Sequence, residues 1–80
     1  MEKIKSVKPL PGFRLEVEFQ DGKLGIVSMQ KRLFGPVFEP LKDPSFFEQV
    51  SVDEFGAVCW PNGADIAPEA VLEEAAPYQA

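Results

Sequence analysis

The stretch FRLEVEFQDGKLGIVSM, residues 13–29, decides which class of fold this chain can adopt. Over residues 13–19 apolar side chains alternate with charged ones, which is the two-residue period of a half-buried β-strand. Asp21-Gly22 follows, and this pair favours a two-residue hairpin turn because both residues can adopt positive φ. We therefore predict an antiparallel hairpin in which Phe19 lies opposite Leu24.

This predicted register decides which side chains of the third strand face the core. Leu24, Ile26 and Ser28 would point inward, whereas Val27 and Met29 would lie on the opposite face. An apolar outer face is normally covered, so we expect another element of the chain or a partner to lie against it. A homodimer could form through this face or through an open edge of the sheet.

The segments around this hairpin predict further strands and two short helices. Asp43-Pro44 and Pro68 have the pattern of helix starts, and prolines and glycines separate the apolar runs. The remaining expected strands are residues 4–8, with a bulge or twist between Ile4 and Val7, and the hairpin 50–52 with 57–60. Residues 37–41 should form an edge strand or a loop.

No strand–helix–strand unit is evident, so we expect an antiparallel sheet. The predicted class is α+β: a three-stranded meander plus a second hairpin, with two short helices, in a single domain over residues 1–80. The last helix, expected to reach about Ala76, should pack Val71, Leu72 and Ala75 inward, and Asp65 should accept backbone hydrogen bonds upstream of it.

The composition excludes several kinds of chemistry. The 80 residues include no histidine and one cysteine, which excludes histidine-dependent catalysis, an internal disulfide and a site built from cysteines alone. The single cysteine fits a reducing cytoplasm, where we expect the protein to be located. No apolar run approaches the ~18 residues of a membrane helix, and we expect no secretory leader and no membrane partner.

Charge is distributed unevenly along the chain. Residues 1–42 hold all eight basic residues against five acidic ones, a balance of +3, whereas residues 43–80 hold eight acidic residues and no basic one. The two halves could neutralise each other within one fold, or the second half could present an acidic surface that recruits a basic partner. The net charge of −5 argues against general binding of duplex DNA.

A second distinctive stretch is VCWPNGADI, residues 58–66. It follows PLPGFRL (residues 9–15), FQDGK (19–23) and GPVFEPLKDPSFF (35–47) in the same chain. Together these motifs resemble the bacterial family known as domain of unknown function 2442, over about residues 3–75. The resemblance implies a small α+β domain, which some members fuse to a helix-turn-helix segment that is not found in these 80 residues.

The same resemblance implies gene neighbourhoods that pair the domain with another small protein, an arrangement suggestive of toxin–antitoxin systems. The family has no established activity, so the resemblance supplies no catalytic residue.

The motif around Trp60 is the main candidate site. An exposed tryptophan beside a rigid turn would anchor a partner, and Asn62 with Asp65 could bind a ligand or cation. Alternatively, Trp60 caps the core, residues 61–63 form a turn and Asp65 fixes the loop. Asn62, Asp65 and Glu69 do not have the spacing of a known cation loop, so we predict no metal and no cofactor.

Other polar groups have structural interpretations. Cys59 has no histidine to activate it and should be an inert thiol, and Glu16 and Glu18 should lie on a solvated strand face. We therefore expect no enzymatic activity and no catalytic residue.

The resulting hypothesis is a non-enzymatic module that binds a small protein partner or itself, with an antitoxin-like or regulatory role. Its predicted contact residues are Trp60, Asn62, Asp65, Phe55, Glu69, Glu73 and Glu74. The alternative is a nucleic-acid-binding regulator that uses the basic residues Lys3, Lys5, Lys8 and Arg14 of the first two strands.

Overall fold

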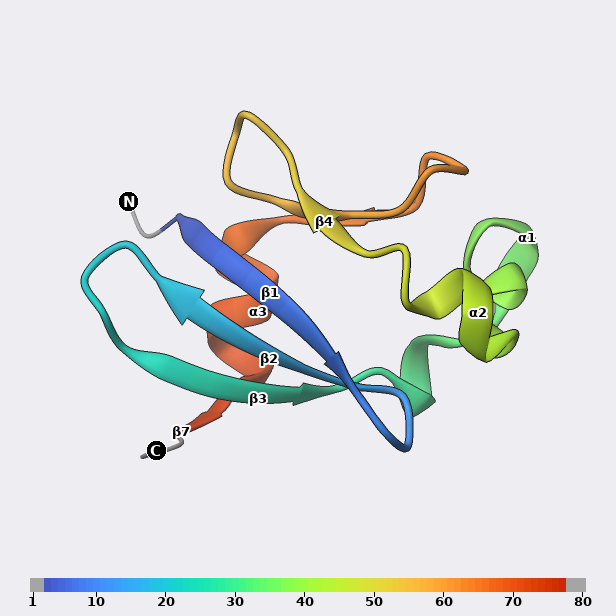
Figure 1. The fold of residues 1–80 in the computed structure, drawn as a ribbon, viewed down its shortest axis with the longest axis horizontal. Helices are drawn as coiled ribbons and strands as arrows, with labels where there is room; N and C mark the ends of the chain where they lie inside the picture. The colour runs from blue at the N-terminus through green and yellow to red at the C-terminus, as the bar shows by residue number, and fades with distance from the viewer. Residues whose placement is uncertain (1–2, 78–80) are drawn as a thin grey trace.

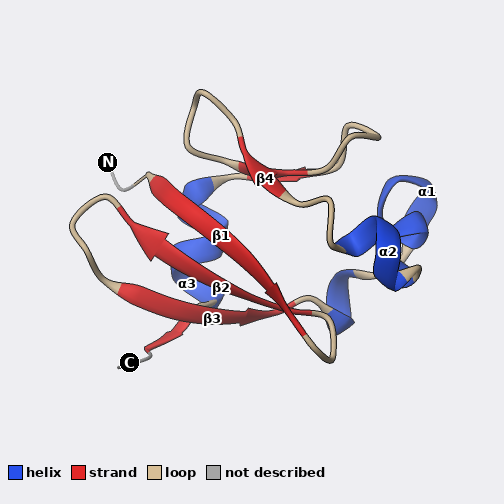
Figure 2. Ribbon diagram, in the orientation of Figure 1, coloured by secondary structure: helices blue, strands red, loops and turns tan. Residues whose placement is uncertain are grey.

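The computed structural model describes residues 3–77 and contains two antiparallel sheets (Figures 1 and 2). The larger sheet has the strand order β1-β2-β3-β7, with β1 (Ile4–Leu10), β2 (Arg14–Phe19), β3 (Leu24–Ser28) and β7 (Ala76–Pro77). The smaller sheet has the order β4-β5-β6, with β4 (Ser51–Val52), β5 (Val58–Cys59) and β6 (Asp65–Ile66). This arrangement confirms the predicted α+β class, the meander and the second hairpin.

Short helical segments connect and cover the sheets. They are η1 (Gln30–Arg32), α1 (Gly35–Phe38), η2 (Glu39–Lys42), α2 (Pro44–Phe47) and α3 (Pro68–Glu74). In Figure 1, α3 lies behind the larger sheet, whereas α1 and α2 lie together beyond one end of its strands. The face of the larger sheet toward the viewer carries no helix of the described chain.

The predicted register of β2 with β3 is wrong by one residue. Glu18, and not Phe19, lies opposite Leu24. The cause is a turn of three residues instead of two: the Phe19 N–H donates to the Lys23 carbonyl at 2.9 Å, and Gly22 alone carries the positive φ, at +89°. Because side chains alternate along a strand, this slip exchanges the two faces of β3.

The exchanged faces change the core. Val27 and Met29 are 1% and 0% exposed, whereas Leu24 and Ile26 are only partly buried on the other face. The predicted dimer surface on Val27 and Met29 is therefore wrong, because the chain buries both side chains in its own core. The other core side chains come from all parts of the fold: Ile4, Leu15, Val17, Phe19, Leu33, Leu41, Phe47, Val58, Trp60, Ala64, Ile66 and Val71.

The same three-residue loop closes three hairpins, at residues 19–23, 53–57 and 60–64. In each loop the N–H of the first residue donates to the carbonyl of the fifth, and the N–H of the fourth donates to the carbonyl of the first. The fourth residue is always glycine, namely Gly22, Gly56 and Gly63, with φ of +89°, +80° and +91°. This pattern matches the three-residue hairpin loop that ends in a left-handed glycine.

The first strand is longer than predicted. β1 continues through Pro9 to Leu10, and its register shifts between Ile4 and Ser6, which confirms the predicted bulge. Pro9 is tolerated because β1 is an edge strand of the larger sheet, where a missing N–H removes no ladder bond.

The prediction of an extended segment at residues 37–41 is wrong, since α1 and η2 occupy these positions. Each of these turns has a proline in its first helical positions, where the missing N–H has no intrahelical partner to lose. Leu41 is fully buried and fixes η2 to the core. The predicted helix at Asp43 is confirmed, because the Asp43 side chain accepts from the Ser45 N–H at 3.1 Å.

The helix α3 is shorter than predicted and buries Val71, but Leu72 is 47% exposed instead of packed inward. The predicted capping role of Asp65 is also wrong. The start of α3 at Ala67 has no capping hydrogen bond from a side chain. Asp65 is an exposed residue of β6 that lies opposite Cys59. Strand pairing, and not a carboxylate, fixes the entry into α3.

Candidate functional site

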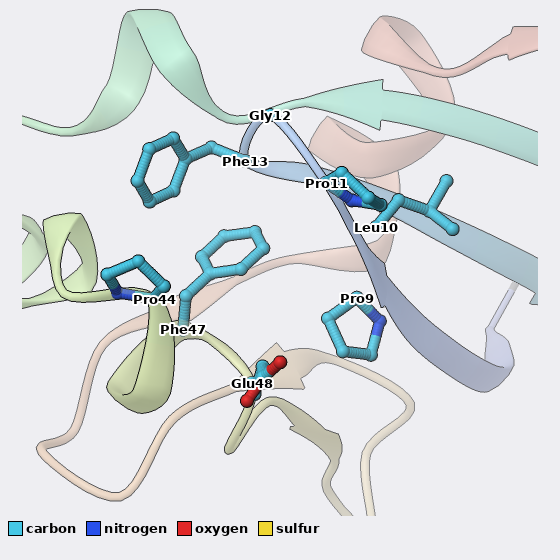
Figure 3. Close-up of a pocket in the computed structure, with 8 residues that line it drawn as sticks. All are labelled: Pro9, Leu10, Pro11, Gly12, Phe13, Pro44, Phe47 and Glu48. Atoms are coloured by element: carbon cyan, nitrogen blue, oxygen red, sulfur yellow. The ribbon is translucent and has the colours of Figure 1, made fainter.

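A groove lies between the turn that joins β1 to β2 and the short helix α2 (Figure 3). Its cavity volume is about 230 Å³, and apolar side chains form most of its surface. The lining residues are Pro9, Leu10, Pro11, Gly12, Phe13, Pro44, Phe47 and Glu48. The groove thus brings together two segments that are more than thirty residues apart in the sequence.

The wall from the β1–β2 turn has an unusual backbone. Gly12 and Phe13 have φ of +79° and +57°, and Phe13 is the one described non-glycine residue with positive φ. Such a conformation of a bulky residue costs about 1–2 kcal/mol and persists only where surrounding contacts enforce it. Hydrogen bonds to the carbonyls of Pro11, Gly12 and Phe13 do so, from Arg14 Nε (3.0 Å), Gln30 Nε2 (3.0 Å) and the Met29 N–H (2.8 Å).

This backbone aims the Phe13 ring at α2. The rings of Phe13 and Phe47 meet edge to face, with centroids 5.4 Å apart and planes at 82°. In Figure 3 the two rings and the Pro44 ring lie close together, and Pro9 lies across the groove from Pro44. Edge-to-face pairs contribute about 0.5–1.5 kcal/mol beyond the area they bury, so this pair holds the turn against the helix.

The opposite wall is fixed from behind by Trp60. Phe47 is 3% exposed, and its carbonyl accepts the Trp60 Nε1–H at 3.0 Å. The Phe47 and Trp60 rings also pack with centroids 5.9 Å apart. The groove therefore exists in the protein alone and does not depend on a ligand to form it.

The lining supports binding more than chemistry. Glu48 is the single ionisable side chain among the lining residues, so the groove holds no acid–base pair and no nucleophile with a base. Elsewhere in residues 3–77, no three acidic or cysteine side chains are placed to share a metal ion. No helix in that part of the chain is long and apolar enough to cross a membrane.

The structure separates the residues of the candidate site that the sequence predicted: some lie in the core and others on the surface. Trp60 is 3% exposed, so the interpretation as an exposed anchor is wrong and the core interpretation holds. Asn62 has a structural role, because its Nδ2 donates to the Val37 carbonyl at 2.8 Å and its Oδ1 accepts from the Ala64 N–H at 3.1 Å. The motif around Trp60 thus links the smaller sheet to α1 and α2.

The remaining predicted contact residues lie on the surface. Phe55 is 71% exposed in the β4–β5 loop, and Asp65 is exposed on β6. Of the three acidic residues of α3, Glu69 and Glu73 are exposed, and Glu74 forms an ion pair with Arg32 of η1. None of these residues lines the groove.

The basic residues of the first strands do not form an uninterrupted strip. Lys5 lies 3.9 Å from the carboxylate of Glu18, and Lys8 lies opposite Glu16 in the sheet. Cys59 is partly buried beside Ser51, with its Sγ 3.5 Å from the hydroxyl oxygen.

Sequence reasoning missed the groove, although two sequence features were available. Residues 9–13 (PLPGF) and 44–47 (PSFF) are the two stretches in which prolines come within three residues of a phenylalanine that lines the groove. The sequence indicates a strand break at the first stretch and a helix start at the second, and both belong to the motifs of the family resemblance, but nothing local indicates that the two meet in space.

Comparison with known proteins identifies one family. A family model described as "Protein of unknown function (DUF2442)" matches residues 4–77. Neither the curated proteins nor the solved structures include a match to this chain.

Proposed function

This chain belongs to the DUF2442 family, and we propose that it acts as a protein-binding module whose binding site is the groove between the β1–β2 turn and α2. In this proposal the groove receives an extended segment of a small partner protein. The module acts by holding that partner and not by catalysis.

The observation that carries this proposal is the preformed apolar groove. Recognition sites are typically concave and mostly apolar, with a few polar groups that fix orientation. This groove has two phenylalanines, three prolines and one carboxylate. Its floor is held by the Phe13–Phe47 ring pair and by the hydrogen bond from Trp60, so little conformational freedom is lost when a segment binds.

The biological role that we propose is that of an antitoxin-like or regulatory member of a pair, in the cytoplasm. The gene neighbourhoods implied by the family resemblance support a small protein as the partner. The single cysteine, which is unpaired, is compatible with a reducing compartment.

The nucleic-acid alternative has less support in the structure. The acidic side chains of Glu16 and Glu18 stand among the lysines of β1, and this neutralises the strip that a phosphate backbone would need. Self-association through the face of Val27 and Met29 is excluded by their burial.

The experiment that tests the proposal compares two phenylalanines. A partner is first captured with the wild-type protein and identified, and its affinity is then measured for Phe13→Asn and Phe55→Ser. Asparagine tolerates the left-handed backbone of position 13 while removing the ring. Phe55→Ser removes an equally apolar side chain from a loop outside the groove.

We expect Phe13→Asn to weaken partner binding at least tenfold and Phe55→Ser to leave it unchanged, with both proteins folded by circular dichroism. Unchanged binding by folded Phe13→Asn would refute the groove as the binding site. Loss of binding in Phe55→Ser alone would move the site to the β4–β5 loop.

A further inference from the structure

We infer that the groove selects a segment in which a lysine or arginine stands beside an inserted apolar side chain, with Glu48 as the counter-charge. This inference rests on the proposed function and states the chemistry of its partner. It is carried by the size of the groove, by the position of its one charge and by the charge of the half of the sequence to which Glu48 belongs.

The size of the groove limits its occupant. A volume of about 230 Å³ lies below the ~300–1,000 Å³ typical of sites for whole small molecules. Such a groove accommodates one or two apolar side chains of a peptide. Pro44, Phe47 and Phe13 would contact them, because these rings gather at one end of the groove (Figure 3).

Glu48 supplies the only charge of the lining and is available to a partner. It is an exposed residue at the C-cap of α2, next to Phe47 in the sequence and in the groove wall. The ion pairs formed within residues 3–77 join Lys5 to Glu18, Lys23 to Asp21 and Arg32 to Glu74, so none of them uses Glu48.

Glu48 belongs to the acidic half of the chain. Residues 43–80 contain eight acidic residues and no basic one, so this half of the chain attracts a positively charged segment. On the other wall, Arg14 is turned toward the carbonyl of Pro11 through its Nε, at 3.0 Å. A basic side chain next to an apolar one therefore complements both the shape and the charge of the groove.

One segment of this chain combines an exposed basic side chain with an exposed apolar one, which makes a second copy the main competing occupant. Phe34 is 71% exposed and follows the exposed Lys31 by three residues. Phe55 is equally exposed but stands beside the acidic residues Asp53 and Glu54, which Glu48 would repel. The test must therefore separate a foreign segment from Phe34 of another copy.

The test is a selection of random seven-residue peptides against the immobilised protein. We expect the wild-type protein to select peptides that pair an aliphatic or aromatic residue with an adjacent lysine or arginine. Glu48→Lys should bind those peptides roughly tenfold more weakly and should favour acidic peptides instead. Glu54→Lys makes the same charge change in the β4–β5 loop, and we expect its selection to match the wild type.

The possible outcomes distinguish failure of this inference, which concerns the chemistry of the bound segment, from failure of the proposed function, which concerns the groove as the binding site. Apolar peptides without basic enrichment, or a basic preference that persists in Glu48→Lys, would overturn this inference and leave the groove as a binding site. Selection that persists in Phe13→Asn would overturn the proposed function itself. Failure to select any peptide, or concentration-dependent self-association that is lost in both Glu48→Lys and Phe34→Ser, would overturn the inference in favour of another occupant.

Discussion

Replacing Gly56 by alanine should destabilise the domain more than the same replacement in either of the other two hairpin loops. The three loops share one hydrogen-bond pattern, and their glycines have nearly equal φ, so any L-residue meets the same backbone strain at each. The loops differ in the free space around the glycine. A Cβ on Gly56 would lie 2.6 Å from Lys3 Cβ and 3.2 Å from Lys3 Cα, whereas a Cβ on Gly22 or Gly63 would meet no atom within 4 Å.

The magnitude follows from these two contributions. A left-handed alanine costs about 1–2 kcal/mol at all three positions. The contact with Lys3 adds an overpacking cost of about 1–3 kcal/mol at Gly56 alone, because a Cβ and a backbone atom cannot rotate away. The loss of unfolded-state freedom on changing glycine to alanine is equal at the three positions and cancels in the comparison.

The assay is urea denaturation of the three variants, monitored by circular dichroism. We expect Gly56→Ala to lose about 1–3 kcal/mol more than Gly22→Ala and Gly63→Ala, which corresponds to a melting temperature at least ~4 °C lower. At ~0.05–0.15 kcal/mol per residue the whole domain is stable by only about 4–12 kcal/mol, so the difference is measurable. The Lys3→Gly change should restore part of the loss in Gly56→Ala, relative to its own cost in the wild type.

Equal losses in all three variants would refute this reasoning, because the first strand would then move away from the β4–β5 loop without cost. That result would also mean that the hydrogen bond from the Ile4 N–H to the Gly56 carbonyl, at 3.1 Å, does not hold the two sheets at a fixed distance.

Two further predictions concern the groove and its supports, and a third concerns the ion pair between η1 and α3. Trp60→Phe should cost about 0.5–1.5 kcal/mol in chemical denaturation, because the Phe47 carbonyl loses the indole N–H and keeps only the longer bond from the Val50 N–H, at 3.3 Å. No measurable loss would contradict the supporting role of the indole bond. Phe13→Gly should be more stable than Phe13→Ala by about 1 kcal/mol, the reverse of the order in a regular strand, because glycine accepts φ of +57° without strain and alanine does not. The melting temperatures of the two variants check which of them is more stable. Glu74→Gln should cost less than about 1 kcal/mol, since the ion pair of Glu74 with Arg32 is partly exposed. If the pair acts through charge, this loss of stability should disappear at about 1 M salt. A loss that does not change with salt would contradict an electrostatic contribution.

Local sequence features predicted the elements of this fold well. The alternation of residues 13–19, the helix start at Asp43-Pro44 and the hairpin of residues 50–52 with 57–60 each depend on features within a few residues, and each is present in the structure. The register of β3 was not predictable in the same way. Its two faces are both apolar, with Leu24 and Ile26 on one and Val27 and Met29 on the other, so alternation cannot choose between them.

The site was less predictable than the fold. The groove needs two segments that the sequence separates by more than thirty residues, and neither segment carries a recognisable motif for binding. Trp60 shows the converse case. Its motif is the most distinctive of the chain, yet the residue serves the structure, because the indole N–H is satisfied by a backbone carbonyl inside the core.

The position of Trp60 also provides an optical probe of the groove. It is the only tryptophan of the chain, and its ring packs on Phe47, which also contacts Phe13 at the groove. A segment that enters the groove and contacts Phe47 will therefore alter the surroundings of the sole indole. We expect intrinsic fluorescence to report occupancy of the unlabelled protein, so that partners can be titrated without a tag or a dye on either molecule.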